Sequence, residues 1–182
     1  MRVITGYARG KSLYTLEGES VRPTSEKVKE AIFSSIQFDI EGRRFLDLFA
    51  GSGQMGIEAL SRGAESCCFC DASAEAIAVI KRNLENCGLS DKADVRKTDY
   101  SAFLAAQTEP FGIAFLDPPY KSGFLKPALE AVSRIMQPYG IILCEHPSDV
   151  VLPGATSNGF VRAKQYKYGK VYVSLYKKED NL

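Results

Sequence analysis

The stretch DLFAGSG, residues 47 to 53, joins a short apolar run, Phe45 to Phe49, to a segment with helical periodicity, Gln54 to Arg62. A glycine turn (Phe49 to Gly53) between a strand and a helix is typical of the carboxyl edge of a parallel sheet, where ligands bind. The spacing Gly51-x-Gly53-x-x-Gly56 also matches a dinucleotide fingerprint. The turn alone therefore predicts a ligand site and leaves the ligand open, because two glycines can also serve only to make a tight turn.

The alternation of strand and helix continues along the chain. Apolar runs predict further strands, and helical periodicity with Gly63 and Gly88 as end signals predicts helices between them. These segments are Ser66–Cys70, Ala93–Lys97, Phe111–Leu116 and Ile141–Cys144 for strands, and Ala74–Cys87, Tyr100–Ala106 and Phe124–Met136 for helices. Strands that alternate with helices predict a mostly parallel, Rossmann-like α/β sheet with helices on both faces.

The two ends of the chain follow other patterns. Phe160–Tyr166 and Lys170–Tyr176 are rich in β-formers and predict an antiparallel C-terminal hairpin, which brings the expected sheet to seven strands. Glycines among short apolar pieces predict a small N-terminal β-hairpin within residues 1–20, and Thr24 is positioned to cap a helix from Ser25 to Ile36. We therefore expect an N-terminal extension, residues 1–42, that faces RNA, and a main domain, residues 43–182.

Composition restricts the class of protein. The 182 residues are 45% hydrophobic and 25% charged, enough for a folded core. No apolar run approaches the roughly 20 residues of a membrane helix, and no signal peptide is recognisable, so we expect a soluble, cytoplasmic protein without a membrane partner. The five cysteines are an odd number, which argues against a disulfide framework. Cys67-Cys68-Phe69-Cys70 lies in a strand-like run, so we expect buried thiols and no metal site.

The net charge is only +1, but both ends of the chain are basic. A local basic field attracts polyanions whatever the net charge, so these residues predict a phosphate-binding rim. The alternative is two ordinary solvated segments. The basic residues are Arg2, Arg9 and Lys11 near the start and Arg162, Lys164, Lys167, Lys170, Lys177 and Lys178 near the end.

Three acids define the ligand expected at the glycine turn. Asp71 ends the second strand, 20 positions after Gly51, where a carboxylate accepts hydrogen bonds from ribose hydroxyls. Asp99 follows the third strand and is placed to reach the exocyclic amine of an adenine. Asp47 would repel a pyrophosphate but suits a cofactor with an ammonium and a sulfonium, which favours S-adenosylmethionine over NAD. The alternative is that Asp47 only shapes the turn. The cofactor contacts expected here are Asp47, Phe49, Ala50, Gly51, Ser52, Gly53, Asp71 and Asp99.

The fourth predicted strand ends in Asp117-Pro118-Pro119-Tyr120. An exocyclic amine is a poor nucleophile, and it becomes a better one when a carboxylate and a main-chain carbonyl each accept one of its hydrogens. Asp117 and the Pro118 carbonyl supply these two acceptors, the prolines stiffen the turn, and Tyr120 can stack on an extruded base. The alternative is an Asp-Pro turn with a surface tyrosine.

Together these motifs resemble the RsmD-type small-subunit ribosomal RNA guanine-N2 methyltransferases. The resemblance rests on Arg22-Pro23-Thr24-Ser25, on Asp47–Gly53 followed by Gly56–Ala64, and on Asp117–Tyr120. It implies a class I methyltransferase fold with S-adenosylmethionine as donor, and methylation of the N2 of one guanine in 16S rRNA, the 966-type position, in an assembling 30S particle. It implies no obligate protein partner. It also adds Thr24 to the cofactor residues, and Arg22 joins Arg2, Arg9, Lys11, Tyr120, Lys164 and Lys167 as RNA contacts.

Some features depart from the family pattern or stay open. Gln54-Met55 stands where the family usually has smaller residues, and Lys27 where an arginine is common. His146 follows the fifth predicted strand and is either a site residue or a packing residue. An adenine-N6 DNA or RNA methyltransferase shares the Asp-Pro-Pro-Tyr motif, a non-catalytic RNA-binding assembly factor could keep the fold, and an NAD-dependent reductase is a third alternative.

Overall fold

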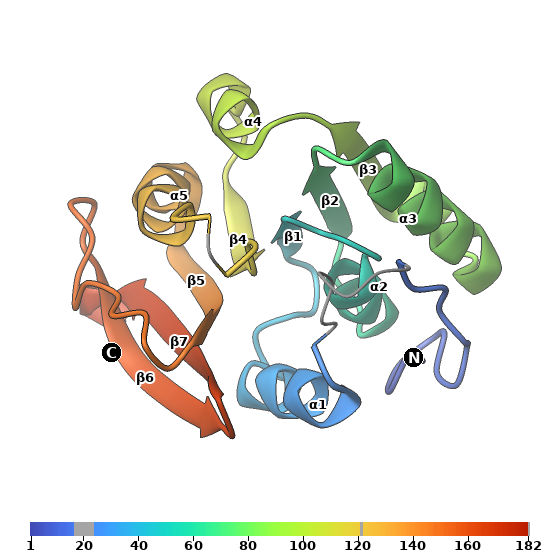
Figure 1. Cartoon of the computed structure of the whole chain (residues 1–182), viewed down its shortest axis with the longest axis horizontal. Coiled ribbons are helices and arrows are strands. Elements are labelled where there is room, and N and C mark those ends of the chain that lie inside the picture. The colour runs from blue at the N-terminus through green and yellow to red at the C-terminus, as the bar shows by residue number, and fades with distance from the viewer. Residues whose placement is uncertain (17–23, 121, 182) are drawn as a thin grey trace.

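The computed structural model describes residues 1–16, 24–120 and 122–181, so the predicted site residues Arg22 and Pro23 lie outside the described part. Its seven strands form one sheet in the order β3-β2-β1-β4-β5-β7-β6, which runs from green to red across Figure 1. The pairs among β1 to β5 are parallel, and β7 pairs antiparallel with both β5 and β6. The strands are β1 (Arg44–Leu48), β2 (Ser66–Asp71), β3 (Ala93–Lys97), β4 (Phe111–Leu116), β5 (Met136–Pro147), β6 (Phe160–Tyr168) and β7 (Val171–Lys178).

Five α-helices cover the two faces of the sheet (Figure 1). They are α1 (Glu26–Ser35), α2 (Gln54–Ser61), α3 (Ala74–Cys87), α4 (Tyr100–Ala106) and α5 (Leu125–Val132), with short 3-10 turns at η1 (Ser90–Lys92), η2 (Ser133–Ile135) and η3 (Glu179–Asn181). Side chains of α1, α2 and α3 share one core, and side chains of α4 and α5 share the other. All six residues of β4 are buried, as expected for a central parallel strand that is covered on both sides. The predicted fold class is therefore confirmed.

Gly56 shows why α2 can pack so closely on the sheet. A Cβ at this position would lie 2.3 Å from a ring carbon of Phe69 and 2.6 Å from the Cys67 sulfur, both on β2. The third glycine of the fingerprint spacing is therefore needed for helix-to-strand packing, whatever ligand the turn binds. On β2 itself, Cys67 faces this core while Cys68 and Cys70 face the opposite one.

Several predicted boundaries were wrong for physical reasons. The helix expected from Phe124 to Met136 ends at Val132, because Met136 already pairs with Phe111 as the first residue of a longer β5. The cap of α1 is Ser25, whose Oγ accepts a hydrogen bond from the Val28 N–H. Thr24 does not cap the helix, because its hydroxyl donates to Glu145 on β5.

The N-terminal segment differs from the predicted hairpin, since its described residues form a turn closed by a single antiparallel bridge between Arg2 and Ser12. It packs beside α2 and α3 (Figure 1). The buried Glu58 carboxylate accepts hydrogen bonds from the main-chain N–H groups of Ile4 and Thr5, at 2.8 and 3.0 Å, and pairs with Lys29 and Arg62. Residues 1–16 are therefore anchored to the main domain by buried polar contacts. No helix in the described part of the chain is long and apolar enough to cross a membrane.

Candidate functional site

The glycine turn has the backbone geometry that its sequence predicts. Gly51 and Gly53 have positive φ angles of 55° and 75°, and Phe49, unusually for a residue with a side chain, has φ of 69°. The turn is held because the Phe49 and Ala50 N–H groups both donate to the Cys70 carbonyl at 3.0 Å. The loop between β1 and α2 is thus fixed to the end of β2.

Asp47, in β1 just before this turn, is almost completely buried, with 2% of its surface exposed. One carboxylate oxygen accepts a hydrogen bond of 2.8 Å from the Gly56 N–H. Burial raises the pKa of Asp47 to about 7, and the charge of Asp71 adds to the effect. A carboxyl group in this state is stabilised in its charged form by a nearby cation.

Asp71 and Asp99 end the next two strands at the same edge of the sheet. Asp71 accepts hydrogen bonds from the N–H groups of Gly51, at 2.8 Å, and Ser73, at 2.9 Å. Asp99 is exposed and caps α4, and hydrogen bonds from Ser101 lower its pKa. Each carboxylate has about four acceptor sites, so both can accept further hydrogen bonds from a ligand.

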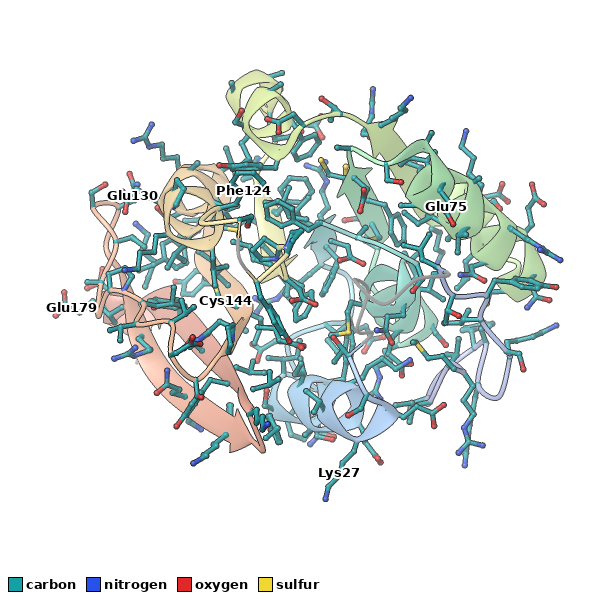
Figure 2. All side chains as sticks on the ribbon, in the orientation of Figure 1. Lys27, Glu75, Phe124, Glu130, Cys144 and Glu179 are labelled. Carbon is teal, nitrogen blue, oxygen red and sulfur yellow. The ribbon has the colours of Figure 1, made fainter. Side chains whose placement is uncertain are left out.

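An aromatic cluster lies beside these acids. The Phe49 ring lies 5.1 Å from Tyr100 and 6.4 Å from Phe124, measured between centroids, and Tyr100 lies 5.2 Å from Phe124. Phe124 lies between α4 and α5 in Figure 2. Phe49 was predicted from its place in the turn, but Tyr100 and Phe124 were not, because nothing in their local sequence separates them from core aromatics.

Asp117 lies at the carboxyl end of β4, where other acids surround it. Burial raises its pKa well above the usual range, and the charges of Glu145 and Asp47 raise it further. Glu145, from β5, is 3% exposed. The sequence analysis did not identify Glu145 as a site residue, because only the pairing of β4 with β5 brings it next to Asp117.

A pocket of about 350 Å³ opens beside Asp117. Its walls come from two segments, residues 118–126 and residues 145–151, and they include Pro118, Tyr120 and Glu145. His146 also lines it, but its ring is held by Ser174 Oγ at 2.9 Å from Nε2 and by the Pro147 carbonyl at 3.0 Å from Nδ1. The second wall was not predicted, apart from the open question about His146.

Thr24 connects the two halves of the site. Its hydroxyl donates to Glu145 Oε2 at 2.8 Å, and its carbonyl accepts a hydrogen bond from Gln54 Nε2 at 3.3 Å. Gln54 begins α2 directly after the glycine turn, whereas Glu145 lines the pocket. By contrast Lys27, the other departure from the family pattern, points outward from α1 (Figure 2).

The predicted basic rim is only partly assembled at this edge. Arg9 follows main-chain contacts with Ser61, the last residue of α2, and the field of Lys11 reaches Cys87, the last residue of α3. Both helices run antiparallel to the strands, so Arg9 and Lys11 lie at the opposite end of these helices from the glycine turn. Arg2 pairs with Glu26 of α1 at 3.2 Å.

The C-terminal hairpin does reach the site. Lys164, Lys167 and Lys170 are exposed, and the hairpin tip (Lys167 to Val171) contacts the second wall of the pocket, because the Ser148 N–H donates to the Lys170 carbonyl at 3.2 Å. Lys167 also lies over the ring of Tyr172 at 5.9 Å.

Comparisons with known proteins agree over almost the whole chain. The family model described as "Conserved hypothetical protein 95" matches residues 1–177. The "Putative rRNA methyltransferase YlbH" of Bacillus subtilis strain 168 is 44% identical over 98% of this chain and 99% of its own. "Ribosomal RNA small subunit methyltransferase D" of Haemophilus influenzae is 33% identical over 97% of this chain and 93% of its own. The solved structure of "Putative methyltransferase yhhF from Escherichia coli" is 28% identical, covers 98% of both chains and has a TM-score of 0.85.

Proposed function

Because this chain belongs to the RsmD-type methyltransferase family, we propose that it methylates the exocyclic N2 of a guanine in 16S rRNA with S-adenosylmethionine as donor. The observation that carries this proposal is the position of Asp117, which lies in a cluster of acids at the mouth of a base-sized pocket. The 966-type position, the assembling 30S particle as substrate and a cytoplasmic location belong to the same proposal.

The residues present fit the cofactor. Asp47, Asp117 and Glu145 are close enough that their charges raise the pKa of Asp117, so a cationic ligand among them is stabilised. The cofactor supplies, when bound, an electrophilic methyl group on a sulfonium, and it also carries an ammonium. In this arrangement Asp71 accepts hydrogen bonds from the ribose hydroxyls and Asp99 from the adenine amine.

The acceptor chemistry falls to Asp117 and Pro118. The Asp117 carboxylate and the Pro118 carbonyl each accept one hydrogen of the guanine amine, so the nitrogen lone pair is directed at the methyl carbon. The N–C bond forms as the C–S bond breaks, and the electron pair of that bond goes to sulfur. The nitrogen then releases a proton, and Asp117 is a competent acceptor because its environment raises its pKa.

The pocket accommodates the base that carries this amine. Its volume of about 350 Å³ lies within the range of small-molecule sites. Tyr120, 41% exposed at its rim, offers a ring for stacking on an extruded base. Because the hairpin tip borders the pocket, we assign phosphate contacts to Lys164, Lys167 and Lys170 rather than to Arg9 and Lys11.

The test is transfer of label from methyl-tritiated S-adenosylmethionine. Purified protein is mixed separately with 30S particles that lack the modification, with naked 16S rRNA and with duplex DNA, and the nucleosides are separated after digestion. We expect label in N2-methylguanosine from an rRNA substrate. Label in N6-methyladenosine would support the adenine-N6 alternative, and no label in any nucleic acid would support the non-catalytic assembly factor.

A further inference from the structure

Gln54 carries a buried acceptor that the folded chain does not satisfy. The residue is 6% exposed. Among the residues that the structure describes, its Oε1 is the buried side-chain polar atom that has no hydrogen-bond partner. Buried polar groups are nearly always paired, so an atom left in this state points to a ligand or a bound water as its partner.

The orientation of the Gln54 amide follows from chemistry. Its nitrogen lies 3.3 Å from the Thr24 carbonyl oxygen, which can only accept a hydrogen bond, so the NH₂ group must face Thr24. Thr24 is itself held by its hydroxyl bond to Glu145. The Gln54 Oε1 must therefore point elsewhere, and the Gln54 side chain starts where the glycine turn meets α2.

The surroundings specify the kind of donor that is missing. Glu145 lies one hydrogen bond beyond Thr24, and Asp117 and Asp47 interact with each other electrostatically in the same region. Ionised carboxylates cannot donate a hydrogen bond to Oε1, but they favour a cation that can. An ammonium group has three N–H donors and one positive charge.

We infer that Gln54 Oε1 accepts a hydrogen bond from the α-ammonium group of S-adenosylmethionine. This inference rests on the proposed cofactor and adds a residue that the glycine-turn pattern does not contain. The contact is specific to this chain, because Gln54 stands where smaller residues are usual in the family. The same side chain then bridges the cofactor and, through Thr24, the Glu145 wall of the acceptor pocket.

Calorimetric titration of the full-length protein with three ligands tests the contact without any turnover. The ligands are S-adenosylhomocysteine, its decarboxylated analogue, which keeps the amine, and its deaminated analogue, which keeps the carboxylate. Gln54→Met preserves the length of the side chain and removes both polar atoms. We expect it to weaken binding of both amine-bearing ligands by about tenfold or more and to leave the deaminated ligand unchanged. Gln107→Met, which makes the same change beyond α4, should leave all three affinities unchanged.

Other patterns would overturn the inference. An equal loss for all three ligands, or no loss, would assign Oε1 to a water or to packing. A loss that follows the carboxylate would mean that the amide donates instead. Should Gln54→Met not fold by circular dichroism, Gln54→Glu keeps the acceptor oxygens and must keep the preference for amine-bearing ligands, and loss of that preference would overturn the contact. If wild-type protein bound none of the three ligands, the proposed cofactor itself would be wrong.

Discussion

Asp47→Asn should make the ligand-free protein more stable as pH rises. The folded-state pKa of Asp47 is about 7 against an ordinary 3.8, because burial disfavours the charged carboxylate. Between pH 4 and 7 the folded state therefore binds more protons than the unfolded state, and wild-type stability falls as pH increases through that window. Asparagine cannot ionise, and its carbonyl oxygen can still accept the hydrogen bond from the Gly56 N–H.

The magnitude follows from the two pKa values. At about 1.4 kcal/mol for each step of one in pKa, the free energy of unfolding of Asp47→Asn should exceed that of wild type by up to roughly 4 kcal/mol at pH 8, by about 1.5 kcal/mol at pH 5 and by little below pH 4. Urea unfolding at these pH values, followed by circular dichroism, measures the difference. Asp91→Asn, which removes an exposed carboxylate in η1, is the matched control.

A second readout separates function from stability. If the charge of Asp47 serves a cationic cofactor, the same variant should bind S-adenosylmethionine more weakly than wild type at pH 8, even though it is more stable. A stability difference that does not change between pH 5 and pH 8, or a variant less stable than wild type at pH 8, would refute the argument that burial raises this pKa.

Three further outcomes are expected. Asp71→Ala should lose about 1.5–3 kcal/mol of S-adenosylmethionine affinity by calorimetry, with Asp71→Asn losing less, and an unchanged affinity for Asp71→Ala would contradict the ribose assignment. Asp117→Ala should abolish methyl transfer while cofactor affinity stays nearly intact, and wild-type turnover would exclude the proposed amine contact. Reversing Lys167 and Lys170 to glutamate should weaken RNA binding and flatten its salt dependence by about 0.7 to 0.9 per lost phosphate contact in the log–log slope. Arg9→Glu should have little effect in the same filter-binding series, and the opposite ranking would favour the N-terminal segment as the RNA-binding surface.

Local sequence determined the order of strands and helices and the position of the site. Residue periodicity and turn chemistry act over a few positions, so α4 and β4 were predicted with the bounds that the structure shows. The glycine turn and Asp117 were placed correctly at the carboxyl edge of the sheet, because a parallel sheet brings the ends of all its strands to one edge. The roles of these residues stay predictions.

Only the tertiary structure decided which groups act together. The Thr24 hydroxyl meets Glu145 across 121 positions of sequence, and no periodicity or motif in a single sequence records such a pair. The raised pKa values of Asp47 and Asp117 likewise come from burial and from one another's charge, which exist only once the strands are paired. Basic residues near the start of the chain looked equivalent to those of the hairpin, but Arg9 follows Ala8, which is bound to Ser61 at the far end of α2. Charge is a property of the sequence, whereas the distance between charges is a property of the fold.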